Sequence, residues 1–434
     1  MSYNLIMKIC EETLDFINKS PSCFHVVENL KTQLCEKGFE YLREDEKWKI
    51  KSGGKYFVVR NGSSVISFVI PKKKFNGFLI SASHSDSPCF KIKENPELSG
   101  TIGVKLNVEK YGGLLLNPWF DRPLSIAGRI VTSSEKKGTL EIKQKLVNFD
   151  RNLLMIPSLA IHMKRDANDV HKIDVQGEMM PVISLDKDFK LKKLIAQETG
   201  TDEEKILSWD LFLYNRDKGT FWGSENEFIS SPRLDDLECV YTTFKGFLEG
   251  KNSEKVLVHA VFDNEEVGSQ SRQGADSTFL KDVLRRINES AGKSSEDFNI
   301  AIARSFLVSA DNAHANHPSY SNVQDPVNHP SVNGGPVIKF NASQKYTSDS
   351  VSAGIFKKIC EKAGVPFQVF TNNSNIQGGS TLGNISNSQV SLLSVDIGIA
   401  QWAMHSPNES AGAKDPELMV RAMKEFYCSN FEIK

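Results

Sequence analysis

The chain lacks the features that mark membrane, secreted and nucleic-acid-binding proteins. Its longest apolar runs have the length of a β-strand, well short of the ~20 residues that a membrane-spanning helix needs. Its 53 Lys and Arg residues nearly balance 54 Asp and Glu residues, so we expect no nucleic-acid partner. The first residues contain neither a basic segment nor a long apolar one, which predicts no signal peptide.

Cysteine is sparse and shows no pairing pattern. The seven cysteines are scattered, their number is odd, and none belongs to a Cys-x-x-Cys motif. This favours a reduced, cytoplasmic protein over a disulfide-bonded one. The length of 434 residues allows a large core and two domains.

Several common motifs are also missing. There is no His-Glu-x-x-His helix of the zincin type and no Gly-x-Ser-x-Gly nucleophile turn. A phosphate-binding loop ending at 292–294 would need glycine where Ile287 stands. The glycine-rich run 378–383 fits neither nucleotide-binding pattern, but Gly379 could bring the backbone close to a substrate.

What the sequence does contain is a pattern of buried strands and helices that predicts an α/β fold. Continuous apolar runs at 78–82, 256–262 and 306–310 are typical of strands buried on both faces of a parallel sheet. A hairpin is expected around 61–62. The other expected strands are 337–340 and 389–393, and the expected helices are 5–18, a second ending near 38, 235–250, 276–291, 348–363 and one from about 415.

A change in the pattern of apolar and polar residues between 95 and 229 predicts a second domain. Three segments mix apolar and polar residues around Gly, Asn and Pro, which is typical of an antiparallel, barrel-like fold: 101–108, 125–132 and 139–147. Residues 163–230 are polar and poorly patterned, so we expect a flexible or interface region there. The domain boundaries predicted in this way are 1–95 together with 230–434 for the α/β domain and 96–229 for a β-rich insert.

Side chains that can bind metal stand at the ends of the predicted elements. His84, Glu266 and Asp311 each follow a buried strand, His405 follows the last strand after a short loop, and Asp235 opens a helix. A parallel sheet would bring these residues to one edge, where α/β proteins bind ligands. Two histidines with several carboxylates suit Zn²⁺, or Mn²⁺ and Co²⁺, in a two-metal hydrolase.

Two neighbouring residues could assist such a centre. In the pair Glu265-Glu266, one carboxylate could hold a metal while the other handles a proton, because successive side chains point in different directions. Asp86 could accept a hydrogen bond from the ring nitrogen of His84 that faces away from the metal. The residues also have non-catalytic alternatives: a solvated acidic loop for the glutamates, a packed histidine, a helix cap for Asp235 and a turn aspartate. Their coincidence at several strand ends favours the catalytic interpretation.

Five motifs follow one another along the chain in a distinctive order. They are Ser83-His84-Ser85-Asp86-Ser87-Pro88-Cys89, Pro232-Arg233-Leu234-Asp235, Asp263-Asn264-Glu265-Glu266-Val267-Gly268-Ser269, Ser309-Ala310-Asp311-Asn312-Ala313-His314 and Ala403-Met404-His405-Ser406. The set resembles the aspartyl-aminopeptidase family of dinuclear zinc exopeptidases over nearly the whole chain. The resemblance implies a mixed-sheet catalytic domain with helices on both faces, an inserted dimerisation domain, and a homododecamer built from dimers.

The resemblance also implies two Zn²⁺ per subunit, peptide substrates with a free N-terminus, and a preference for N-terminal Asp or Glu. The implied ligands are His84 and Asp311 for one ion, Glu266 and His405 for the other, and Asp235 as the bridge. Asp86 would orient a ligand, Glu265 would be the general base, and Tyr346 would steady the oxyanion. Lys339 would line the pocket for the first side chain, and His162 of the insert would reach a neighbouring subunit's site.

Two stretches depart from the family pattern. The residues 407–409 stand where relatives commonly have Arg-Glu soon after the histidine, and 374–378 lack an acidic residue common before the glycine-rich run. The second departure would alter recognition of the substrate's amino terminus or first side chain. Two alternatives to an aminopeptidase remain: a related dinuclear deacylase or carboxypeptidase, and an inactive assembly protein of the same fold.

Overall fold

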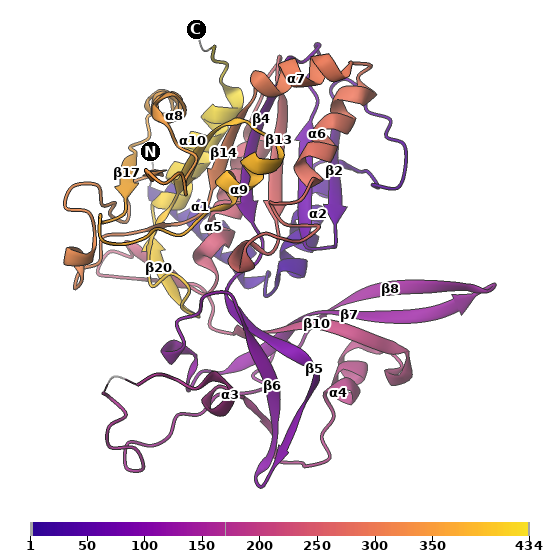
Figure 1. Ribbon diagram of the computed structural model, residues 1–434, viewed down its shortest axis with the longest axis vertical. Helices are drawn as coiled ribbons and strands as arrows, with labels where there is room; N and C mark the ends of the chain where they lie inside the picture. The colour runs from indigo at the N-terminus through magenta and orange to yellow at the C-terminus, as the bar shows by residue number, and fades with distance from the viewer. Residues whose placement is uncertain (1–2, 170, 433–434) are drawn as a thin grey trace. The chain divides into compact units, whose positions relative to one another are not determined.

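The computed structural model describes residues 3–169 and 171–432, which fold as two compact units (Figure 1). The first unit comprises the chain up to Asp86, residues 219–404, and the segment from Glu409 onwards. The second unit comprises residues 87–218 and the short segment 405–408.

A nine-stranded mixed sheet organises the first unit, in the order β1-β2-β3-β13-β4-β14-β18-β16-β17. Its strands are β1 Glu40–Tyr41, β2 Lys55–Arg60, β3 Ser64–Val69, β4 Phe78–His84, β13 Val256–Phe262, β14 Phe306–Ala310, β16 Val337–Phe340, β17 Gln368–Thr371 and β18 Leu393–Gly398. The four central strands β13, β4, β14 and β18 run parallel. Their carboxyl ends therefore lie at one edge of the sheet.

Helices cover both faces of this sheet (Figure 1), as the family resemblance implies. Along β13, Leu257 and Val261 join one hydrophobic core, whereas Val258 and Ala260 join the other, because successive side chains alternate between faces. The first core is shared with α1 Tyr3–Asn18, α2 Cys23–Glu36, α5 Leu234–Glu249, α8 Ser350–Ala363 and α10 Asp415–Cys428. The second is shared with α6 Phe279–Ser290, α7 Ser295–Ala303 and α9 Leu382–Gln389.

A five-stranded sheet completes the first unit. The sheet has the order β11-β12-β20-β19-β15, with β11 Thr220–Trp222, β12 Phe228–Ser231, β15 Ala313–His314, β19 Ala400–Trp402 and β20 Glu409–Gly412. Among the described residues, the 3-10 helices are η3 Glu265–Val267 and η4 Ser321–Val323 in this unit and η1 Asn117–Trp119 and η2 Glu203–Lys205 in the second unit.

The second unit is built on an antiparallel six-stranded sheet in the order β8-β7-β10-β5-β6-β9. Its elements are β5 Cys89–Gly100, β6 Gly103–Tyr111, β7 Leu124–Lys136, β8 Thr139–Asn148, α3 Val175–Glu178, β9 Val182–Ser184, α4 Leu191–Thr199 and β10 Ile206–Asn215. Strands β7 and β8 form a long hairpin (Figure 1). The antiparallel, β-rich fold expected for this part of the chain is confirmed. Among the described residues, β8 and β9 are the two ends of an open sheet, and no closed barrel forms.

Three local expectations also need correction. The strand expected at 389–393 is β18, which starts only at Leu393, because α9 occupies the residues up to Gln389. The stretch 163–230 is not poorly structured: it holds β10, which pairs with both β5 and β7 inside the sheet. The strand expected at 101–108 begins at Gly103, after a tight turn that joins it to the unforeseen β5.

No helix among the described residues is both long and apolar enough to cross a membrane. The seven cysteines all lie in the described chain, and none of them forms a disulfide bond.

The buried His259 of β13 gives the first unit a predicted acid sensitivity. Its ring packs against those of Phe244 and Phe247, with centroids 5.5 and 5.8 Å away, and burial lowers its pKa from 6.5 to about 3. Below pH 6.5 the unfolded chain therefore binds a proton that the folded chain excludes, so stability is lost as the pH falls. Between pH 6.5 and 5 this amounts to about 2 kcal/mol.

We expect His259→Gln to flatten the dependence of the thermal unfolding midpoint on pH between 7.5 and 5. The variant comparison is needed because other groups contribute: burial and Arg233 lower the pKa of His25 to about 4, while burial raises that of Asp415 to about 7. Half-buried His317→Gln is the control for loss of an imidazole. If the unfolding midpoint of His259→Gln depended on pH as steeply as that of wild type, His259 would not be the cause of the acid sensitivity.

Candidate active site

The carboxyl edge of the parallel strands gathers most of the predicted metal ligands. His84 is the last residue of β4, Asp311 directly follows β14, and Glu265 and Glu266 open η3 shortly after β13. Asp235 lies at the start of α5, where its backbone is extended rather than helical (φ −80°, ψ 110°). These residues all belong to the first unit.

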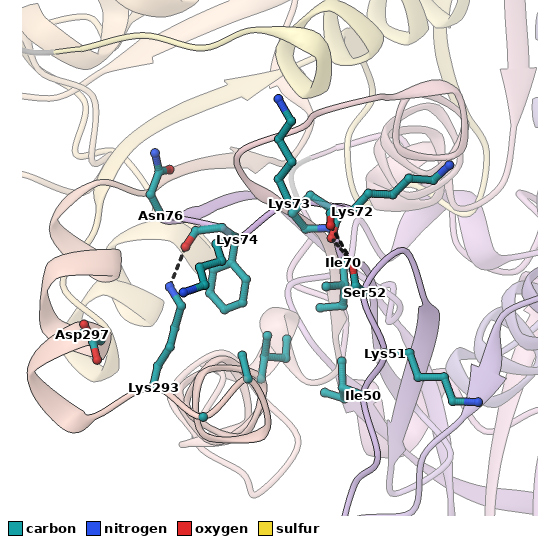
Figure 2. Close-up of a pocket in the computed structure, with 15 residues that line it drawn as sticks. Ile50, Lys51, Ser52, Ile70, Lys72, Lys73, Lys74, Asn76, Lys293 and Asp297 are labelled. Atoms are coloured by element: carbon teal, nitrogen blue, oxygen red, sulfur yellow. Dashed lines mark hydrogen bonds between the residues drawn. The ribbon is translucent and has the colours of Figure 1, made fainter.

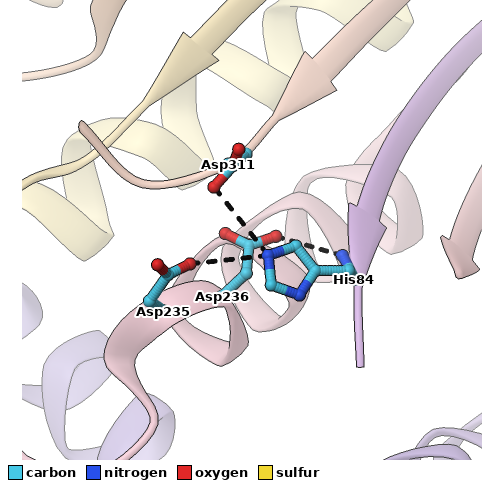
Figure 3. A group of neighbouring side chains, drawn as sticks. All are labelled: His84, Asp235, Asp236 and Asp311. Atoms are coloured by element: carbon cyan, nitrogen blue, oxygen red, sulfur yellow. Dashed lines mark hydrogen bonds and ion pairs between the residues drawn. The ribbon is translucent and has the colours of Figure 1, made fainter. Parts of the chain in front are cut away.

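The His84 side chain is the centre of the cluster. Its Nε2 atom lies 3.5 Å from Asp235 Oδ1 and 3.8 Å from Asp311 Oδ1, and Figure 3 shows both carboxylates directed at this nitrogen. Asp236 supports it from behind, because its Oδ2 accepts the backbone N–H of His84 at 3.1 Å. His84, Asp235 and Asp236 are each at most 3% exposed.

The electrostatics of this cluster call for a cation. Burial alone would lower the pKa of His84, but Asp236, Asp235, Asp311 and Asp86 outweigh it and raise that pKa well above 6.5. Burial and the neighbouring carboxylates, against the charge of His84, raise the pKa of Glu265 to about 8. Several buried carboxylates around one imidazole are costly without a partner charge, and they form the donor set that Zn²⁺, Mn²⁺ or Co²⁺ prefers. The residues present therefore fit a divalent metal.

Asp86 has a wider role than the sequence suggested. It lies beside His84: the ring Nδ1 is 3.0 Å from the Asp86 carbonyl oxygen and 3.4 Å from its Oδ1. Its two carboxylate oxygens also accept the backbone N–H groups of Glu265 and Glu266, each at 3.2 Å. Asp86 thus ties the end of β4 to the short helix that carries both glutamates.

A second set of buried polar residues, which sequence reasoning missed, holds Asp235. Glu409 Oε2 accepts the backbone N–H of Asp235 at 3.0 Å, and both Glu409 and Gln401 are 1% exposed. Gln401 in turn accepts from Asn312 Nδ2 at 3.0 Å, and the same amide nitrogen donates to the carbonyl of Leu234 at 3.1 Å. These hydrogen bonds connect Asn312, the residue after Asp311, to the start of α5.

No periodic pattern marks these residues in the sequence. Asp236 could have been noticed as the second member of an Asp-Asp pair, and Glu409 as an acidic residue near His405. Only the fold shows that they bond to the backbone of predicted ligands.

Removing the Glu409 carboxylate should weaken metal binding. We expect Glu409→Ala to raise the metal dissociation constant by about 10–100-fold, the usual effect of losing a group that positions a ligand. Glu409→Gln keeps an acceptor oxygen and should restore most of the affinity. Competition with a chromophoric chelator measures the affinity, and the absorption spectrum of the Co²⁺ form reports ligand geometry.

The matched control is Glu361→Ala, an exposed carboxylate on α8. If Glu409→Ala bound metal with wild-type affinity and an unchanged Co²⁺ spectrum, the positioning role of Glu409 would be refuted.

Lys339 and Tyr346 lie next to the cluster. Lys339 is 2% exposed, and its Nζ donates to the Asp311 carbonyl at 2.7 Å and lies 3.5 Å from Asp311 Oδ2. Burial alone would lower the pKa of Lys339, but Asp311 and Tyr346 outweigh it and raise that pKa. The Lys339 ammonium also stands 5.3 Å from the centre of the Tyr346 ring. Lys339 is thus already engaged with a predicted metal ligand.

The remaining predicted residues are Gly379 in the first unit and His162 and His405 in the second. Gly379 is exposed, and a Cβ there would meet no atom within 4 Å. Two other glycines of this run are crowded: a Cβ on Gly378 would lie 2.5 Å from Asn372 Oδ1, and one on Gly383 would lie 2.7 Å from Asp396 Oδ1. His162 is exposed in the second unit, and His405 belongs to that unit's short segment, where its Nδ1 faces the Gly113 carbonyl at 2.7 Å.

A sheet whose parallel strands end in a buried group of imidazole and carboxylates is typical of metallohydrolases. A family model described as aminopeptidase I zinc metalloprotease (M18) matches residues 16–427. A relative from Clostridium acetobutylicum, named probable M18 family aminopeptidase 2, is 46% identical over 431 residues, covering 97% of this chain and 99% of its own.

Solved structures agree with this match. The structure of an Ape4 and Nbr1 complex has a TM-score of 0.93 at 39% identity and covers 97% of this chain and 86% of that one. The Saccharomyces cerevisiae mApe1 dodecamer has a TM-score of 0.84 at 27% identity, covering 97% and 96%. The chain belongs to the M18 family of zinc metalloproteases, and it is a peptide hydrolase that acts as an aminopeptidase.

Proposed function

We propose that this aminopeptidase works with two Zn²⁺ ions per subunit and prefers peptides that begin with Asp or Glu. The observation that carries the metal centre is the convergence of Asp235 and Asp311 on one nitrogen of buried His84. Mn²⁺ or Co²⁺ would suit the same ligands.

The ligands are divided between the two ions by resemblance to the family. His84 and Asp311 would hold one ion, Glu266 and His405 would hold the other, and Asp235 would be a ligand of both. Metal in this centre supplies a Lewis acid and lowers the pKa of a bound water towards neutrality. The close approach of His84, Asp235 and Asp311 supports the first half of this assignment.

The remaining residues act on the proton and on the substrate. Glu265 takes a proton from the water that attacks the first peptide carbonyl and delivers it to the leaving amine. Its backbone bond to Asp86 supports this role, because it keeps Glu265 beside the cluster. The Tyr346 hydroxyl donates to the developing oxyanion.

Substrate recognition is assigned to three residues. Lys339 provides positive charge at the base of the pocket for an acidic first side chain, in addition to its bonds with Asp311. Gly379 leaves open space beside the substrate backbone, which its empty surroundings support. His162 completes the site of a neighbouring subunit.

We also propose an assembly of the kind named for the S. cerevisiae structure, a homododecamer built from dimers in the cytoplasm. Residues 96–229 would form the dimerisation domain, and 1–95 with 230–434 would form the catalytic domain. The compactness of each of the two units supports a division near these boundaries.

Hydrolysis of aminoacyl p-nitroanilides with free and N-acetylated amino groups tests this function. Free Asp and Glu substrates should be cleaved fastest, and acetylation should abolish cleavage. Faster cleavage of neutral substrates would overturn the acidic preference while keeping the aminopeptidase. Cleavage of only the acetylated compounds would favour a deacylase, and no cleavage with any metal would favour an inactive assembly protein.

A further inference from the structure

A lysine-lined pocket lies at the opposite edge of the large sheet from the candidate active site. It has a volume of about 710 Å³ and is formed by the loop before β2, the loop between β3 and β4, and the segment joining α6 to α7. Strand β4 runs from this edge, at Phe78, to His84, a span of about 20 Å at ~3.3 Å per residue. The pocket is therefore separate from the metal cluster.

The lining of the pocket is strongly positive, although the whole chain has a net charge of only −1. Its lining contains the five lysines Lys51, Lys72, Lys73, Lys74 and Lys293 and a single carboxylate. That carboxylate, Asp297, caps α7 by accepting from the Ser294 backbone N–H at 2.8 Å and from its hydroxyl at 2.7 Å. Asp297 is thus already engaged, and most of the positive charge is left without a counter-charge in the lining.

Lys74 and Lys293 both line the pocket, as labelled in Figure 2. Lys293 Nζ donates to the Phe75 carbonyl at 2.5 Å, which fixes its position. Burial lowers the pKa of Lys293 and the charge of Lys74 lowers it further, against the opposing effect of Asp297. A bound anion would relieve this repulsion.

The floor of the pocket is apolar. Ile70, Phe75 and Ile287 are each at most 7% exposed, and Ile50 is half-buried beside them. The volume falls in the range of about 300–1,000 Å³ that is usual for small-molecule sites. The combination of an apolar floor and a rim of long, cationic side chains suits a compact ligand with several negative charges.

We propose that this lysine pocket binds a small polyphosphate anion. Lysine serves as a point-charge partner for phosphate oxygens, and several lysines converging on one concave site raise the local potential. The ligand would be either a nucleoside triphosphate, whose base covers the apolar floor, or an inorganic polyphosphate held by charge alone. The proposal is independent of the metal centre and of the peptidase mechanism.

Isothermal titration of the holoenzyme with adenosine triphosphate and with inorganic tripolyphosphate tests the proposal. The triple variant Lys72→Gln, Lys73→Gln, Lys74→Gln should bind both anions at least tenfold more weakly than wild type. Among the three single variants, Lys74→Gln should cause the largest loss of affinity. Binding by wild type should weaken as salt is raised, because the contacts are ionic. Tighter binding of the nucleotide than of tripolyphosphate would identify a nucleoside triphosphate as the class of ligand.

The matched control is Lys357→Gln, Lys358→Gln, Lys362→Gln on α8, which removes the same charge elsewhere. Both anions chelate divalent ions, and this effect is equal in the two triple variants, so the difference between them reports the pocket. Unchanged aminopeptidase activity shows that both variants are folded. Absence of saturable binding, equal affinities in the two triple variants, or binding of an oligoglutamate peptide but neither polyphosphate would overturn the proposal.

Discussion

Replacing Glu265 with Gln is expected to lower kcat by about 10²–10⁴-fold while the protein keeps its full complement of metal. Glutamine has nearly the same shape but cannot accept the proton of the attacking water. The backbone N–H of residue 265 would still donate to Asp86, which lies 3.2 Å away, so the loop that carries Glu266 should stay in place.

Steady-state hydrolysis of a p-nitroanilide substrate, together with elemental analysis of the purified variant, measures both quantities. Glu289→Gln on the exposed face of α6 is the matched control and should behave as wild type. A near-normal kcat in Glu265→Gln would mean that another group is the general base. A loss of metal would mean that Glu265 is a ligand.

Removing the metal with a chelator should reduce aminopeptidase activity by at least 100-fold and lower the thermal unfolding midpoint. The stability effect follows because His84 is surrounded by Asp235, Asp236 and Asp311, whose buried charges would lose their counter-ion. A ligand that binds only the folded state adds stability in proportion to the logarithm of its concentration over its dissociation constant. Zn²⁺, Mn²⁺ or Co²⁺ should restore both properties.

The number of ions decides whether the centre is dinuclear. Wild type should contain two metal ions per chain, and His405→Ala should contain one, with half-buried His317→Ala as the control for loss of a histidine. One ion in wild type would refute the two-metal mechanism but not the aminopeptidase. Full activity of a metal-free preparation would refute the metal centre itself.

The sequence was most informative where apolar runs are continuous. The run 256–262 became β13, buried on both faces, and it leads to Glu265 and Glu266 as expected. His84 and Asp311 likewise stand where their strands end. Such predictions succeed because a parallel strand between two helix layers needs apolar side chains on both faces, which leaves a clear signal.

The errors fall where that signal is weak. Strand β10 contains Ser208 and Asp210 among its apolar residues, and its place between β5 and β7 depends on pairing partners more than 70 residues away. Helix α9 is short and rich in Asn and Ser, so its packing against the sheet outweighs its poor helix propensity.

The sequence by itself therefore determined the α/β class, the order of the motifs, and the residue types that suit a zinc peptidase. The tertiary structure decided which polar residues support them. Asp86 holds the two glutamates, and Glu409 holds Asp235 across a separation of 174 residues. These hydrogen bonds are donated by backbone N–H groups, which every residue except proline possesses. The residue types of the donating segments therefore could not predict them. The lysine pocket is likewise visible only once three distant loops meet at one edge of the sheet.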